Sequence, residues 1–113
     1  MILIIREPVT PDQTIQMSEI YGEALIKLAV DVGRGVLAGG GDLHADCELA
    51  LLEDGSQQND IWGADWYPQE REVGFESLIN IRPKQNNRAL EVQDLALCAQ
   101  IENIVRRLLE VEA

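Results

Sequence analysis

Apolar residues recur at every second position from Ile26 to Val32, and this alternation restricts the fold of the chain more than any other feature. In an extended backbone, successive side chains point to opposite sides, so one side would carry Ile26, Leu28, Val30 and Val32. The pattern predicts a half-buried strand over residues 26–32. Gly33 and Gly35 then favour a reversal, after which residues 36–38 would return as an antiparallel strand.

Other segments also have the composition of strands. Residues 2–5 form a short apolar run rich in isoleucine, which favours an interior strand. Residues 61–67 and 73–81 are typical of two strands joined through residues 68–72, and alternation in the second would direct inward Val73, Phe75, Ile79 and Ile81. Residues 47–53 are ambiguous, because their leucine spacing suits either a strand or a helical turn.

Two segments carry the signals of a helix start. In the first, Thr10 can cap a helix, Pro11 suits the first helical position and Gln13 completes a capping box. These residues predict a helix over about residues 11–22. In the second, Asp94 is a candidate cap for a helix whose apolar stripe comprises Leu97, Ile101, Ile104, Val105 and Leu108.

The chain has the size and composition of one domain. Its 113 residues, 46% of them hydrophobic, suffice for one core but not for two independent cores. We therefore expect a single domain over residues 1–113, of the α+β class. The simplest arrangement is a single mixed or antiparallel sheet with two helices packed on one face.

Acidic residues dominate the charge of the chain. Twenty aspartates and glutamates against nine lysines and arginines give a formal net charge of -11. This charge repels nucleic acids and anionic membranes, so we expect neither as a partner. The apolar start is too short for a signal peptide or a membrane span, and two distant cysteines fit reduced thiols. We therefore expect a cytoplasmic protein.

The stretch GGGDLHADCE, residues 39–48, is the first candidate site. His44 and Glu48 point the same way in a strand or in a helix, and Asp46 joins them if the chain is extended. An imidazole with two carboxylates suits a divalent metal or acid–base catalysis. The alternative is a sharp glycine turn followed by an ordinary strand, with a histidine that is solvated or hydrogen-bonded locally. Cys47, between two acids, is expected to be a buried thiol rather than a nucleophile.

A basic stretch and a tryptophan-containing strand give the second candidate site. Residues 80–88 contain no acid, and we expect an anion-binding role for Arg82, Asn86, Asn87 and Arg88. The same bases can instead pair with acids of the molecule or of a neighbouring subunit. Trp62 and Trp66 share one side of residues 61–67 and suit a ligand cleft, a subunit interface or the core.

Four short motifs extend over most of the chain: GGG at residues 39–41, HADCE at 44–48, WGAD at 62–65 and NIRP at 80–83. Together they resemble the pattern of an uncharacterised prokaryotic family catalogued as domain of unknown function 5674. A family without an assigned activity implies no mechanism. The resemblance therefore leaves the chemistry to be inferred from the residues.

Two classes of function follow from these features. The first is a small acidic cytoplasmic domain that forms a homo-oligomer through the tryptophan strand and an exposed sheet surface. The alternative is a metal-assisted hydrolase or a protein that binds a small anionic ligand. In it, His44, Asp46 and Glu48 would act as catalytic groups or metal ligands, and Arg82 would bind the charge of the substrate. A third hypothesis, a module that binds a basic protein, rests on net charge alone.

Overall fold

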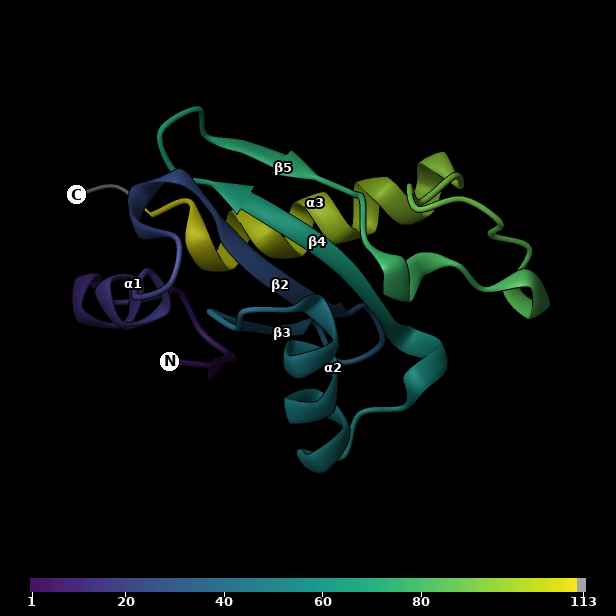
Figure 1. The fold of residues 1–113 in the computed structure, drawn as a ribbon, viewed down its shortest axis with the longest axis horizontal. Coiled ribbons are helices and arrows are strands. Elements are labelled where there is room, and N and C mark those ends of the chain that lie inside the picture. Colours follow the sequence, from purple (N-terminus) through teal and green to yellow (C-terminus); the bar gives the residue numbers. More distant parts are fainter. Residues whose placement is uncertain (112–113) are drawn as a thin grey trace.

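A computed structural model describes residues 1–111 of the chain (Figure 1). The strands are β1 (Leu3–Ile5), β2 (Ile26–Asp31), β3 (Val36–Gly39), β4 (Ile61–Tyr67) and β5 (Glu72–Gly74). The α-helices are α1 (Pro11–Met17), α2 (His44–Glu53) and α3 (Leu95–Leu109). Single turns of 3-10 helix, η1 to η4, cover Gly22–Ala24, Gln58–Asp60, Leu78–Asn80 and Pro83–Gln85.

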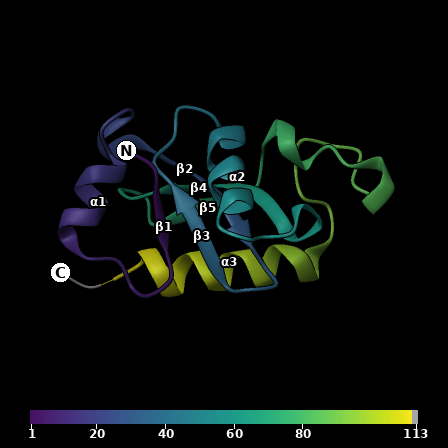
Figure 2. The same cartoon turned by 90° about the horizontal axis from the view of Figure 1, so that it is seen from below.

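The five strands form one sheet in the order β1-β3-β2-β4-β5, and every neighbouring pair is antiparallel. Figure 2 shows α3 along one face of this sheet and α2 on the other. The α+β class and the antiparallel sheet are thus confirmed. The prediction of two helices on one face is wrong, because residues 1–111 contain three α-helices and both faces are covered.

The two faces of the sheet bury side chains of different size. On one face, large residues such as Leu28 and Trp62 pack against the apolar stripe of α3, whose members Ile101, Val105 and Leu108 are fully buried. On the other face, small residues such as Ala29 and Ala38 lie under α2. Small side chains let a helix approach the sheet closely, so the second face is buried although alternation suggested that it faced solvent.

The ambiguous residues 47–53 belong to helix α2, which begins at His44. Cys47 and Leu51 lie one turn apart and are both fully buried against the sheet. The side chain of Asp46 accepts a hydrogen bond of 3.2 Å from the backbone amide of Leu43, one of the free donors at the start of the helix. A helix of ten residues therefore follows the glycine turn, where an ordinary strand was one expectation.

The glycine triplet of residues 39–41 is required by close packing. Gly40 has a φ of +100°, and a Cβ atom there would overlap the backbone oxygen of Met1. A Cβ atom at Gly39 would lie 2.8 Å from a methyl group of Leu28, and one at Gly41 would lie 3.0 Å from the sulfur of Cys47. These contacts account for the triplet without a ligand.

Both predicted helix caps are confirmed. The Thr10 hydroxyl accepts from the backbone amide of Gln13, and the Gln13 side chain accepts from the backbone amide of Thr10. Asp94 accepts from the amides of Ala96 and Leu97 at the start of α3. Helix α1 ends at Met17 rather than near residue 22, because the chain leaves the helix at Ser18 and reaches the 3-10 turn η1.

The predicted strand over residues 73–81 is wrong beyond Gly74, where β5 ends. From residue 75 the chain turns away from the sheet and forms η3 over β4. The side chain of Asn80 replaces a strand here: its Oδ1 accepts from the amide of Gly63 at 2.8 Å and its Nδ2 donates to the Gly63 carbonyl at 3.0 Å. Ile81, predicted to point inward, is therefore 44% exposed.

An ionic network fixes the turn between β2 and β3 to the end of α2. The buried carboxylate of Asp31 accepts hydrogen bonds from Ser56, Gly33 and Arg34. The guanidinium of Arg34 also reaches Asp54 at 2.8 Å. Arg6, just after β1, contacts the other oxygen of Asp54. Three separate parts of the chain thus meet at two carboxylates.

We expect this network to make folding sensitive to acid. Burial raises the pKa of Asp31, but its hydrogen bonds with Ser56, Arg34 and Gly33 together lower the pKa by more, so the net shift is downward. Hydrogen bonds from Arg6 and Arg34 lower the pKa of Asp54 to about 2. A carboxyl group with a lowered pKa in the folded state stabilises above its unfolded pKa, near 4, and this contribution is lost as the pH falls towards 2. Urea midpoints between about pH 5 and pH 2 should therefore fall less in Asp54→Asn than in the wild type; parallel curves would contradict this.

A methyl group at Gly63 should also destabilise the fold. A Cβ atom there would overlap the Cβ of Ser77 and lie 2.6 Å from its hydroxyl oxygen. We expect Gly63→Ala to lower the free energy of unfolding by about 2 kcal/mol. Ser77→Gly removes the Cβ and hydroxyl oxygen that oppose the new methyl group. The double variant should therefore lose less free energy of unfolding than the sum of the losses in the two single variants. Urea denaturation checks this, and strict additivity would contradict it.

Candidate functional site

His44 and Glu48 lie one turn apart on the side of α2 that faces β4 and residues 75–93. This confirms that the two side chains share a face. Nε2 of His44 lies 2.7 Å from Oδ1 of Asp65 on β4, and these side chains are only 14% and 11% exposed. The carboxylate of Glu48 lies 3.0 Å from Nη2 of Arg82. Two polar pairs therefore connect α2 to the rest of the site.

Arg82 is bound on almost every side by the protein itself. Its Nε donates to the carbonyl of Ile79 at 2.9 Å, and its Nη1 donates to the carbonyl of Gln58 at 2.8 Å and to the side chain of Gln85. The guanidinium also lies over the ring of Trp62, 4.8 Å from its centre. Burial lowers the pKa of Arg82, and the charge of Glu48 opposes that shift. These contacts give the guanidinium a structural role at the junction of α2, η2 and η3.

Asp46 does not join His44 and Glu48. Helix α2 rotates it to a different side, where it caps the amide of Leu43. Within residues 1–111, no three histidine, cysteine or acidic side chains are grouped so that they can hold a metal ion. The catalytic and metal-binding roles of His44, Asp46 and Glu48 stay predictions, and only two of the three side chains share a surface.

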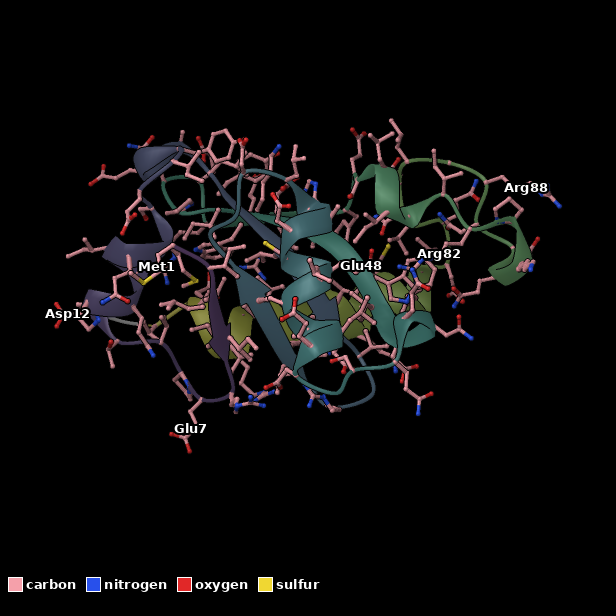
Figure 3. The ribbon with its side chains drawn as sticks, turned by 60° about the horizontal axis from the view of Figure 1, so that its bottom comes forward. Met1, Glu7, Asp12, Glu48, Arg82 and Arg88 are labelled. Carbon is pink, nitrogen blue, oxygen red and sulfur yellow. The ribbon has the colours of Figure 1, made fainter. Side chains whose placement is uncertain are left out.

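The remaining predicted ligand-binding residues differ in their accessibility. Asn87 is buried, and its side chain donates to the carbonyls of residues 80, 89 and 91 and accepts from the amide of Gln93. Trp62 is buried beneath Arg82. Asn86, which has a left-handed φ of 62°, and Arg88 are exposed on the same loop. Figure 3 shows Arg82 near Glu48 and Arg88 at the far end of the loop.

Two pockets flank the exposed side chain of Leu78, which contributes to both. The larger, of about 600 Å³, lies between α2, η2 and the turns η3 and η4, and its lining includes Gln58, Asn59, Ile81, Pro83 and Lys84. The smaller, of about 350 Å³, lies beside the start of α2, and its lining includes Lys27, Leu43, His44, Glu76 and Leu90. The two polar pairs belong to this surface, since Glu48 and Arg82 line the larger pocket and His44 lines the smaller one.

The chemistry available at this surface differs between its groups. The carboxylate of Asp65 fixes the orientation of the His44 imidazole through Nε2, an arrangement that suits proton transfer by the other ring nitrogen. Burial raises the pKa of the Cys47 thiol to about 11, which keeps it protonated at neutral pH. Asp65 was not predicted to belong to the site, whereas Lys84 lies in the basic stretch of residues 80–88 that was. For Asp65, the signal was alternation, which places it opposite the two buried tryptophans.

Arg82 and Glu48 should contribute unequally to stability. We expect Arg82→Met to lower the free energy of unfolding by about 3 kcal/mol, because carbonyl groups of residues 58 and 79 lose their donor and Glu48 loses its counter-charge. Glu48→Gln keeps a side-chain oxygen that accepts from the guanidinium and should cost about 1 kcal/mol. Urea denaturation measures both values. A larger loss in Glu48→Gln would contradict the structural role of Arg82.

Comparison with known proteins places the chain in a family. None of the helices in residues 1–111 combines the length and apolar character needed to cross a membrane. No curated protein and no solved structure matches the chain. The sequence model of one family, described as "Protein of unknown function (DUF5674)", matches residues 3–108. The chain therefore belongs to the DUF5674 family.

Proposed function

We propose that the protein binds a small organic anion in the larger pocket, between α2 and the turns η2, η3 and η4. The volume of about 600 Å³ lies in the range of small-molecule sites. One part of the wall is apolar and accessible, since Ile81 and Pro83 are exposed. Another part carries the side chains of Gln58 and Asn59, which add hydrogen-bonding groups.

The proposal depends mainly on Lys84, a charged side chain of the pocket wall that has no ion-pair partner within residues 1–111. Arg82, the cation that the sequence favoured as the anion-binding residue, already donates its hydrogen bonds to carbonyl groups and to Glu48. An unpaired ammonium group beside apolar walls suits a molecule with a carboxylate or phosphate at one end and an apolar body at the other.

Asn86 and Arg88 are exposed on the same loop, and we assign them a smaller role than Lys84 in binding the anion. Arg88 lies outside the lining of the pocket and adds only to the local positive potential. Such a potential speeds the approach of an anion without selecting its shape. Selection among anions would instead follow from the apolar wall and from Lys84.

Catalysis by His44 is a second proposal, which the pairing with Asp65 favours. The imidazole lines the smaller pocket, next to the proposed anion site, and its Nε2 is held at 2.7 Å from the carboxylate. Proton transfer by this group needs no metal ion. A metal-assisted reaction would require Glu48 to leave Arg82 and Asp46 to leave the start of the helix, so we prefer the acid–base role. If phenyl phosphate is hydrolysed, His44→Asn, which removes the imidazole, should slow its hydrolysis at least about 100-fold while its binding persists; an equal rate would contradict the role.

Calorimetric titration with phenyl phosphate and with inorganic phosphate tests the binding site. We expect phenyl phosphate to bind more tightly, because only it can also use the apolar wall. Lys84→Gln should weaken its binding about tenfold, which is the loss of one charge-assisted contact. Arg88→Gln is the matched control, since it changes the net charge equally but lies outside the pocket, and it should bind nearly as the wild type.

Two results would contradict the anion site. An equal loss of affinity in Lys84→Gln and Arg88→Gln would mean that phenyl phosphate responds to net charge rather than to the pocket. An absence of heat and of chemical-shift changes with both probes at millimolar concentration would remove the proposal altogether.

A further inference from the structure

The surface around the smaller pocket carries a ridge of exposed apolar side chains. Leu78 is 78% exposed, and Leu43, Ile81 and Leu90 are between 43% and 55% exposed. Leu78, Leu43 and Leu90 all line the smaller pocket. A projecting leucine thus stands at the edge of an apolar hollow of about 350 Å³.

We propose that a second copy of this chain covers the surface, with the Leu78 side chain of each copy seated in the smaller pocket of the other. A two-fold interface uses the same patch on both copies, so it requires a surface that fits itself. Leu78 lies directly beside the smaller pocket. A two-fold axis that passes between the side chain and the pocket therefore places the Leu78 of each copy opposite the smaller pocket of the other. The contact differs from the one expected from the sequence, since Trp62 and Trp66 are buried in the core.

The distribution of charge favours a second copy over a basic partner. The chain carries a net charge of -11, which opposes contact between two copies over most of their surface. The linings of the two pockets carry three bases, Lys27, Arg82 and Lys84, against two acids, Glu48 and Glu76. This surface is therefore one where repulsion between copies is weak. A basic partner, in contrast, would be attracted to the acidic remainder of the molecule.

Two charges at the smaller pocket also suit a two-fold contact. Lys27 and Glu76 both line it, and neither forms an ion pair within residues 1–111. Around a two-fold axis, each Lys27 can approach the Glu76 of the other copy, so that the pair occurs twice. The smaller pocket, which His44 also lines, is the apolar partner site, so the dimer and the acid–base role of His44 are alternative uses of this pocket. The larger pocket retains Lys84 and the side-chain amides of Gln58 and Asn59 for a small ligand. The dimer does not depend on the proposed ligand.

Light scattering coupled to size-exclusion chromatography, at loading concentrations from about 10 µM to about 1 mM, tests the dimer. We expect the mass of the wild type to rise from that of one chain to that of two. Leu78→Ser should raise the dissociation constant by about tenfold or more, because it removes the side chain that enters the pocket. Leu95→Ser is the matched control: Leu95 is 84% exposed on α3, lines neither pocket, and should leave the dimer unchanged.

Three results would overturn the proposed dimer. One is a single-chain mass for the wild type across the whole range of concentrations. Another is an equal effect of Leu78→Ser and Leu95→Ser, which would mean that association uses apolar surface without regard to position. The third is a dimer unaffected by Leu78→Ser, which would place the contact elsewhere. Circular dichroism confirms that each variant is folded, and Leu90→Ser, on the rim of the same pocket, should weaken the dimer as well.

Discussion

Asn80 takes the place of a neighbouring strand along the free edge of β4, and the candidate site depends on this substitution. β2 pairs along the other edge of β4, whereas β5 pairs with β4 only at residues 65–67, so no strand lies beside the first half of β4 on this edge. The amide side chain of Asn80 supplies both a donor and an acceptor to Gly63, as a backbone would. Gly63 lacks the Cβ atom that would keep η3 at a distance. The chain can therefore cross over β4, and Arg82 then reaches α2.

The polar pairs of the site follow from this crossing. With η3 over β4, the guanidinium of Arg82 meets the carbonyls of residues 58 and 79 and the carboxylate of Glu48, which connect η2, η3 and α2. Asn87 holds the other end of the segment by bonding to residues 80, 89, 91 and 93. These hydrogen bonds and those of Asn80 tie the segment to the sheet and to α2, and Leu78 and Lys84 are exposed on it. Residues on such a segment are well placed to contact a ligand or a second copy.

Local patterns were sufficient to predict four of the strands and two of the three α-helices, but not how the helices are placed on the sheet. The alternation over residues 26–32, the capping box at Thr10 and Gln13, and the cap and stripe of α3 all correspond to observed elements. Residues 44–53 and 75–81 were harder because their structure depends on distant contacts. Cys47 and Leu51 are helical where they cover Ala29 and Ala38, and residues 75–81 lose strand geometry because Asn80 bonds to Gly63. No spacing within either segment reports those partners. In the site, the shared face of His44 and Glu48 was predictable from geometry common to strands and helices, whereas their pairing with Asp65 and Arg82 was not.

Amide hydrogen exchange at Gly63 tests most directly whether a side chain closes the edge of β4. The amide of Gly63 should exchange as slowly as the backbone amides that pair β2 with β4. In Asn80→Ala this protection should be lost at Gly63, while the amides of α3 stay protected and report that the core is intact. Rapid exchange at Gly63 in the wild type, or unchanged protection in Asn80→Ala, would show that Asn80 does not hold the segment in place.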